Sequence, residues 1–294
     1  MQPFSFLSDG TSNALRLQCG HTLWSLDKLP FNSPIEWTIE EKMRLVKDAG
    51  FVHIECWIED DERGRTVVRE VELNGLMLAL GHRPSTPEAT LDAVRRAHKF
   101  GAKWVLCQPA IAYHSLQEVV EIVRAGSQLA AELNINYFVE THRNNFTETI
   151  RQTLELIEAV PDIAIIADFS HFAVVGEFYG WSGAGVIERM RPIIERVAHV
   201  HGCISNGELV QVDVGDGQDL SEGPPAGFFF EMWRECFSTW RKRAGQGDVM
   251  PFSTELGPPC YAITTREGLE ISDRWEQSLV MRDLTERAWK AYAI

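Results

Sequence analysis

Four residues that could bind a divalent cation each lie at the end of a short apolar run. These residues are Glu140, Asp168, His201 and Glu255. Three carboxylates and one neutral imidazole suit manganese, magnesium or cobalt, with zinc possible, because such cations favour oxygen ligands. Carboxylates crowded into one pocket also repel one another and take up protons unless a cation compensates their charge. The residue types therefore predict one divalent metal ion if the fold brings the four together.

Each of these residues also has a purely structural interpretation. An acidic residue at a strand end commonly caps a helix or accepts hydrogen bonds from a loop. A histidine on an apolar strand is commonly a hydrogen-bonded core residue. The recurrence favours a shared function, because such residues end four successive apolar runs.

Further polar residues beside these strand ends could contact a substrate. His142 shares a strand face with Glu140 and could bind a substrate oxygen or transfer a proton. Arg143 could pair with a carboxylate or phosphate, or form a structural ion pair. His171 follows Asp168 and could transfer a proton or orient that carboxylate through a hydrogen bond. The other candidate substrate contacts are Glu55, Gln108, His199 and Gln211, with Trp24, Trp57 and Trp181 as faces on which a sugar could stack.

Glu55 has a second interpretation. It shares a strand face with His53, and a polar layer inside the protein explains this pair as well as a substrate contact does.

The scaffold is predicted by an alternation of short apolar runs with longer helical patterns. Eight runs have strand length: Leu15–Cys19, Val52–Trp57, Leu76–Leu80, Trp104–Cys107, Ile135–Glu140, Ile163–Asp168, Val197–His201 and Met250–Glu255. Strands separated by single helices form parallel βαβ units, and eight right-handed units can close into a barrel. The sequence thus predicts an α/β fold, a single-domain (β/α)8 TIM barrel over residues 1–294, in preference to an open doubly wound sheet. Chemistry is then expected at the carboxyl ends of the strands.

Helix signals support this spacing. Start signals occur at Thr38 with Glu41, Thr86 with Pro87, Ser115 with Glu118, and Asn145 with Glu148. Two later helices are expected over Phe228–Arg243 and Ser272–Ala291, after a long loop over Gly215–Gly227.

Composition narrows the functional classes. The chain has 28 basic and 42 acidic side chains, a net charge of −14, which argues against nucleic acid as a partner. No run approaches the ~20 apolar residues of a membrane span, and Met1–Gly10 lacks the pattern of a signal peptide. The six cysteines form no Cys-x-x-Cys pair, which is typical of free thiols in a cytosolic protein. We therefore expect a cytoplasmic protein that acts on a small molecule.

The order Glu140, Asp168-x-x-His171, His199-x-His201 and Glu255 resembles the xylose isomerase-like TIM barrels, the sugar phosphate isomerase/epimerase superfamily. The likeness runs from about the second strand to Pro259. It implies that Glu140, Asp168, His201 and Glu255 bind one divalent metal ion, often manganese, with His171 beside the substrate. It also implies a homo-oligomer, a dimer or tetramer. Two departures are Thr141, where many members have proline, and Gly202-Cys203, where many have a Lys-Asp pair.

The expected function is a metal-dependent isomerase or epimerase of a small sugar or keto-sugar. The metal would act as a Lewis acid that stabilises an enediolate, and Glu140 and Glu255 would move the proton, with His171 as a further carrier. A lyase using the same enolate chemistry, a dehydratase or a C-glycoside-cleaving enzyme, is the runner-up. An abasic-site endonuclease and a non-catalytic sugar-binding barrel remain as alternatives. Arg143 is the one conspicuous basic group near the ligands, which favours a free or oxidised sugar over a phosphorylated one.

Overall fold

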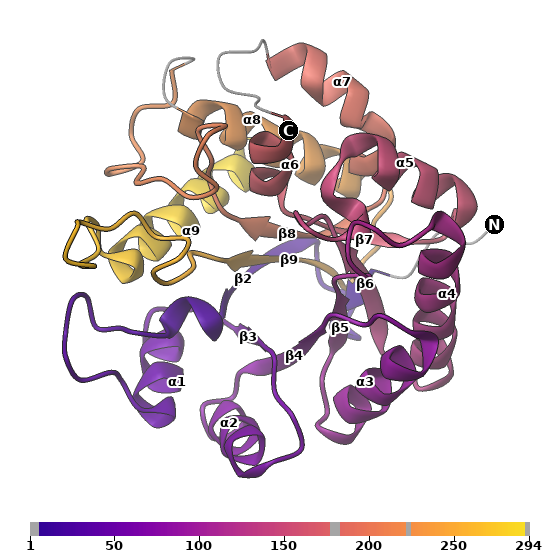
Figure 1. The fold of residues 1–294 in the computed structure, drawn as a ribbon, viewed down its shortest axis with the longest axis horizontal. Coiled ribbons are helices and arrows are strands. Elements are labelled where there is room, and N and C mark those ends of the chain that lie inside the picture. The colour runs from indigo at the N-terminus through magenta and orange to yellow at the C-terminus, as the bar shows by residue number, and fades with distance from the viewer. Residues whose placement is uncertain (1–5, 177–182, 222–224, 292–294) are drawn as a thin grey trace.

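The computed structural model describes residues 6–176, 183–221 and 225–291, and its centre is a closed barrel of parallel strands (Figure 1). The barrel strands are β2 (Arg16–Thr22), β3 (His53–Cys56), β4 (Met77–His82), β5 (Trp104–Cys107), β6 (Asn136–Glu140), β7 (Ala164–Ala167), β8 (Val197–Gly202) and β9 (Asp248–Thr254). Each strand pairs with the next along the chain, and β9 pairs with both β8 and β2, which closes the ring. The predicted (β/α)8 barrel is confirmed.

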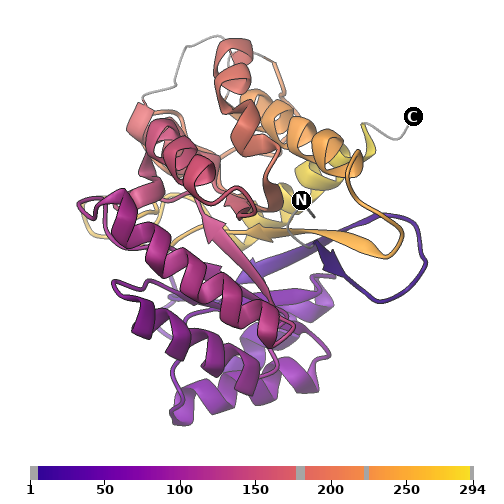
Figure 2. The ribbon, with the colours of Figure 1, turned by 90° about the vertical axis from the view of Figure 1, so that its right-hand side faces the viewer.

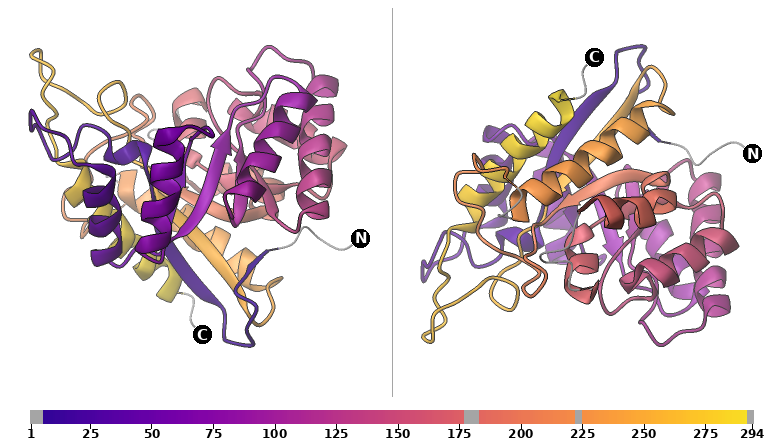
Figure 3. Two further views of the ribbon diagram at one scale, coloured as in Figure 1. Left: turned by 90° about the horizontal axis from the view of Figure 1, so that it is seen from below. Right: turned by 90° about the horizontal axis from the view of Figure 1, so that it is seen from above.

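Helices cover the outside of this ring on all sides (Figures 2 and 3). They are α1 (Ile39–Asp48), α2 (Glu62–Leu73), α3 (Pro87–Lys99), α4 (Leu116–Glu132), α5 (Ile150–Ala159), α6 (Phe169–Gly176), α7 (Gly183–Ile194), α8 (Pro225–Arg241) and α9 (Arg274–Lys290). Buried apolar side chains from the helices pack on the outward faces of the strands, which is the usual outer core of this architecture. None of the described helices combines the length and apolar character that a membrane crossing requires.

Most of the predicted helix starts are confirmed. Capping boxes begin α1 at Thr38 and α4 at Ser115, and Thr86 caps α3. The start predicted at Asn145 is wrong. This residue leads only into a short 3-10 turn, η2 (Phe146–Glu148), without capping it, and α5 begins after Thr149 instead. The Asn145 amide is used elsewhere, because its Nδ2 lies 3.0 Å from Nδ1 of His142.

Several boundaries differ from the sequence-based expectation. Strand β2 ends three residues later than expected, and α8 begins within the stretch expected as a loop. A short strand that the sequence pattern did not reveal, β1 (Leu7–Ser8), pairs antiparallel with β9. The long strands β2 and β9, indigo and orange in Figure 3, run side by side, so the first and the last strand of the barrel are neighbours.

Candidate metal centre

The fold brings the four predicted metal ligands together at one mouth of the barrel. Glu140 ends β6, Asp168 follows β7, His201 lies near the end of β8, and Glu255 follows β9. One ligand atom from each side chain lies within 4.8 Å of all the others. The cluster is deeply buried, with Glu140 and His201 fully covered and Glu255 the most exposed at 9%. Adjacent parallel strands explain the convergence, because their carboxyl ends meet at the same rim.

Three of the four side chains direct unpaired polar atoms into this cluster. Within the described chain, Oε1 of Glu140, Nδ1 of His201 and Oε2 of Glu255 are buried without a hydrogen-bond partner. Nδ1 of His201 lies 3.3 Å from Glu140 Oε1 and 2.5 Å from Glu255 Oε2, but these contacts do not have hydrogen-bond geometry. Buried polar atoms nearly always have a hydrogen-bond partner, so three such atoms without one at the same place need an explanation. A divalent cation fits, because it would take all three as ligands together with Asp168.

The pKa shifts within the cluster also favour a bound cation. Burial and the charge of Glu255 raise the pKa of Asp168 to about 8. Burial also raises the pKa of Glu255. For His201, burial acts to lower the pKa, but Glu255, Glu55 and Glu140 outweigh it and hold this pKa well above its usual value. Without a cation the cluster therefore retains protons, and a bound cation would displace them.

Three of the four ligands are held by a further contact. Glu55 Oε2 lies 3.0 Å from Nε2 of His201, which leaves Nδ1 facing the other ligands. Oε2 of Glu140 accepts a hydrogen bond from Gln108 Nε2 at 2.7 Å. Oδ1 of Asp168 accepts from the backbone N–H and the hydroxyl of Ser170, at 2.9 and 2.5 Å. These contacts fix the orientation of the three side chains.

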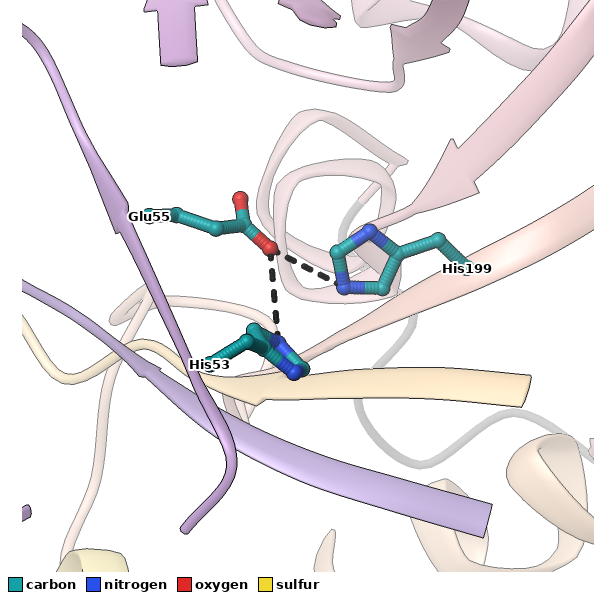
Figure 4. Close-up of side chains that lie close together, drawn as sticks. All are labelled: His53, Glu55 and His199. Carbon is teal, nitrogen blue, oxygen red and sulfur yellow. Dashed lines mark ion pairs between the residues drawn. The ribbon is translucent and has the colours of Figure 1, made fainter. Parts of the chain in front are cut away.

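Beneath the ligands lies a fully buried polar layer of His53, Glu55 and His199 (Figure 4). Their ligand atoms are close enough to hold a second metal ion. However, the Ser253 hydroxyl occupies the space between them. It lies 2.8 Å from Nε2 of His53 and 3.1 Å from Nε2 of His199, and it donates a hydrogen bond to Oε1 of Glu55. The layer is therefore a hydrogen-bonded support for His201, and β2 makes room for it with Gly20, where a Cβ atom would lie 2.1 Å from the His53 ring.

Several residues that were expected to contact the substrate lie elsewhere. Glu55 and His199 are completely covered and lie one layer below the ligands, so the internal polar layer is the interpretation that the structure favours for Glu55. Gln211 does not line the pocket that contains Glu255: it lines a separate small cavity with Leu256 and Arg274, and its Nε2 donates to the carbonyl oxygen of Gly257 at 3.2 Å. Trp181 lies outside the described residues.

A pocket of about 520 Å³ opens at the ligand cluster. Its lining residues are Leu23, Trp24, Asp27, Trp57, Arg63, Arg83, Gln108, His142, Glu255 and Tyr261. The sequence analysis singled out Trp24, Trp57, Gln108, His142 and Glu255 among these. It missed Arg63, Arg83 and Tyr261, which lie outside the strands that the apolar runs predicted. Arg83 directly follows β4, and the longer extent of that strand is the signal that would have placed it at the rim.

Two neutral imidazoles stand beside the cluster. The rings of His142 and His171 have centroids 3.8 Å apart, and Nε2 of His171 lies 3.5 Å from Oδ2 of Asp168. Burial lowers the pKa of His142 to about 4 and that of His171 well below its usual value. Arg143 stacks over the Tyr261 ring, 4.6 Å from its centroid. The imidazoles can thus accept protons or bind hydroxyl groups near the pocket.

Comparison with known proteins agrees with the barrel fold. A family model described as xylose isomerase-like TIM barrel matches residues 43–235. The chain belongs to this family. Among curated proteins, none matches the sequence.

Solved structures share the barrel at low sequence identity. The probable 3-DHS dehydratase AsbF from Bacillus anthracis has a TM-score of 0.56 at 18% identity, covering 92% of this chain and 99% of that one. A sugar phosphate isomerase/epimerase from Parabacteroides distasonis has a TM-score of 0.56 at 14% identity, with 96% of each chain covered. A xylose isomerase-like TIM barrel protein from Mycobacterium smegmatis, in complex with magnesium, has a TM-score of 0.53 at 13% identity, covering 93% and 97%. At such identities the likeness establishes the fold alone.

This xylose isomerase-like barrel uses Thr141 in a specific way. Its hydroxyl donates to the carbonyl oxygen of Asp168 and accepts from the Asp168 N–H, both at 3.0 Å. The residue after Glu140 therefore holds the backbone of the neighbouring ligand, a role that proline could not perform because it has no side-chain hydrogen-bonding group.

Proposed function

We propose that this xylose isomerase-like barrel is a divalent-metal-dependent isomerase or epimerase of a small sugar or keto-sugar. The observation that carries the proposal is the cluster of buried atoms without hydrogen-bond partners on Glu140, His201 and Glu255, the last of which lines the pocket. These residues and Asp168 would hold the cation, with manganese expected and magnesium, cobalt or zinc as alternatives. The relatives named for isomerase/epimerase activity and for a magnesium complex support this proposal.

We assign removal and return of the proton to different residues of the site. A bound cation would supply Lewis-acid stabilisation of negative charge on the substrate oxygens. Glu255 lines the pocket and is the most exposed ligand, so we assign to it removal of the proton from the substrate carbon. Return of a proton is assigned to Glu140, or to His171, which adjoins Asp168; because burial keeps the His171 ring neutral, either residue must first take up a proton from solvent. Return to the neighbouring carbon gives isomerisation, and return to the same carbon from the other face gives epimerisation. Glu255 then releases the abstracted proton to solvent.

Elimination is a second candidate, because the same proton abstraction can expel a β-substituent. The match to a probable dehydratase favours this alternative over the others. Loss of water or of an aglycone, seen in the product by NMR, would distinguish a lyase from an isomerase.

The test is exchange of substrate hydrogen in deuterium oxide. Protein loaded with each of the four metals would be incubated with a panel of aldoses and ketoses and the corresponding sugar acids and phosphates, and deuterium incorporation followed by NMR. We expect incorporation at one carbon by the native chain, and a loss of at least about 100-fold in Glu255→Gln. Glu267→Gln, which changes an exposed carboxylate, is the matched control. Absence of exchange across the panel, or full exchange by Glu255→Gln, would overturn the proposal.

The homo-oligomeric state and the cytoplasmic location stay predictions. So does the exclusion of nucleic acid as a partner.

A further inference from the structure

Two guanidinium groups at the pocket are free of ion pairs within the described chain. Arg63 and Arg83 both line the pocket and are exposed. Some exposed arginines elsewhere are paired: Arg65 pairs with Asp60 at 2.8 Å and Arg95 with Asp92 at 3.0 Å. In a chain with a net charge of −14, arginines that remain unpaired beside a cavity are candidates for binding an anionic ligand.

The acidic residues of the pocket have partners of their own. Asp27 pairs with Lys42, whose Nζ lies 3.1 Å from its Oδ1 and which also pairs with Glu36. Glu255 belongs to the ligand cluster, where a cation would neutralise it. Within the described chain neither carboxylate forms an ion pair with Arg63 or Arg83, so both guanidinium groups remain available to an anionic ligand.

Arg83 is oriented by the same network that holds a metal ligand. Its Nε donates to Oε1 of Gln108 at 2.9 Å, and Gln108 Nε2 donates to Oε2 of Glu140 at 2.7 Å. One end of the guanidinium is thus fixed, and its remaining N–H groups stay available to a ligand. Guanidinium groups bind carboxylate and phosphate oxygens with a defined geometry, so this residue can set the distance between an anionic group and the reacting carbon.

The rest of the pocket suits a small hydroxylated ring or chain. Trp24 and Trp57 supply aromatic faces on which sugar carbons can stack, and about 520 Å³ accommodates a molecule of monosaccharide size. We infer that the substrate carries an anionic group, as in a hydroxylated carboxylic acid or its phosphorylated counterpart, and that Arg83, assisted by Arg63, binds this group. The inference rests on the proposed function, because it takes the pocket to be the substrate site.

The test compares matched neutral and anionic probes. Isothermal titration calorimetry with magnesium-loaded protein would use uronates, aldonates and cyclic hydroxy acids, each beside its neutral amide, and the corresponding sugar phosphates. We expect at least one acid or phosphate to bind about tenfold or more tightly than its neutral partner, with a preference that weakens as salt is added. The tighter of the two anion types identifies the anionic group.

Variants then assign the preference to residues. Arg83→Gln should abolish it and Arg63→Gln should reduce it, whereas Arg95→Gln, on the outer helix α3, should leave it unchanged. Because Arg83 also contacts Gln108, the magnesium affinity of Arg83→Gln must be measured, and we expect it to stay within about threefold of native. No anion preference across the panel, or a preference that survives in the Arg63→Gln, Arg83→Gln double variant, would overturn the inference.

These outcomes separate the inference from the proposed function. Deuterium exchange on neutral sugars that is undiminished in Arg83→Gln would keep the isomerase and reject the anion site. Binding of an acid that depends on Arg83, without deuterium exchange on any probe, would keep the anion site and reject the isomerase.

Discussion

Oε2 of Glu55 lies 3.0 Å from Nε2 of His201, and both side chains are fully buried beneath the ligand cluster. A carboxylate at this position holds the proton on Nε2, so that Nδ1 is free to bind a metal ion. The two residues belong to β3 and β8, which are far apart in the sequence, and closure of the barrel brings them together.

We predict that Glu55→Gln weakens divalent metal binding by about 10- to 100-fold, because the amide holds the His201 ring less firmly. The measurement is a competition titration against a chromogenic chelator, with circular dichroism to confirm folding. Glu267→Gln is the control, as an exposed carboxylate far from this layer. An affinity equal to native in folded Glu55→Gln would show that the contact does not position His201.

Metal binding should stabilise the fold, and the Glu140→Ala, Asp168→Ala double variant should lose that effect. At a manganese concentration about 100-fold above Kd, native protein gains about 2.7 kcal/mol. The metal-free stabilities of the two proteins are compared separately, because the substitutions remove repulsion between the carboxyl groups but also leave Gln108 and Ser170 without their acceptors. Thermal unfolding with and without manganese measures both. Equal metal-induced shifts in the two proteins would contradict the assignment of the ligands.

The stability of the fold should fall in mild acid, because the buried histidines take up protons more readily once the chain is unfolded. Burial lowers the pKa of His21 to about 4 and that of His82 to about 3, whereas the unfolded chain titrates near 6.5. Between these values the unfolded state binds more protons, so the stabilisation is complete above about pH 6.5 and is lost as the pH falls toward 4.

Each such histidine contributes a slope of about 1.4 kcal/mol per pH unit in that window. Urea unfolding at a series of pH values measures the slope, and His82→Gln should reduce it by about one histidine's share. A slope that His82→Gln leaves unchanged would contradict the account.

Ser253→Ala should destabilise the protein by about 2 kcal/mol or more. The change removes the hydroxyl that contacts His53, His199 and Glu55 at once, and it leaves their buried polar atoms unpaired. Ser12→Ala, at an exposed site, is the control for urea unfolding. A change below about 0.5 kcal/mol would indicate that another group replaces the hydroxyl.

The ligand cluster could be predicted because it depends on strand ends alone. Glu140, Asp168, His201 and Glu255 follow recognisable apolar runs, and parallel closure in chain order places such residues at one rim. The depth at which each inward-facing residue lies in the barrel could not be predicted in the same way. A period of two puts His199 on the same inward face as His201, but in a barrel the residue two positions earlier lies one layer deeper. His199 therefore supports the site from below.

The two arginines escaped prediction for a different reason. Arg63 lies in the first turn of α2 and Arg83 directly follows β4, so neither belongs to an apolar run that would have drawn attention to it. Asn145 shows the related problem for helix starts. Its type and offset to Glu148 fit a helix cap, but its amide contacts His142 instead, and only the folded chain reveals which partner it takes.

The strand that closes the ring is also the one synthesised last. β9 pairs with both β2 and β8, and Glu255 follows it directly. A growing chain that has not yet released this segment from the ribosome has an open sheet and an incomplete ligand set. The complete ligand set for the proposed ion therefore forms only once this strand has paired, so the metal supply that the closed barrel meets would decide which cation it carries.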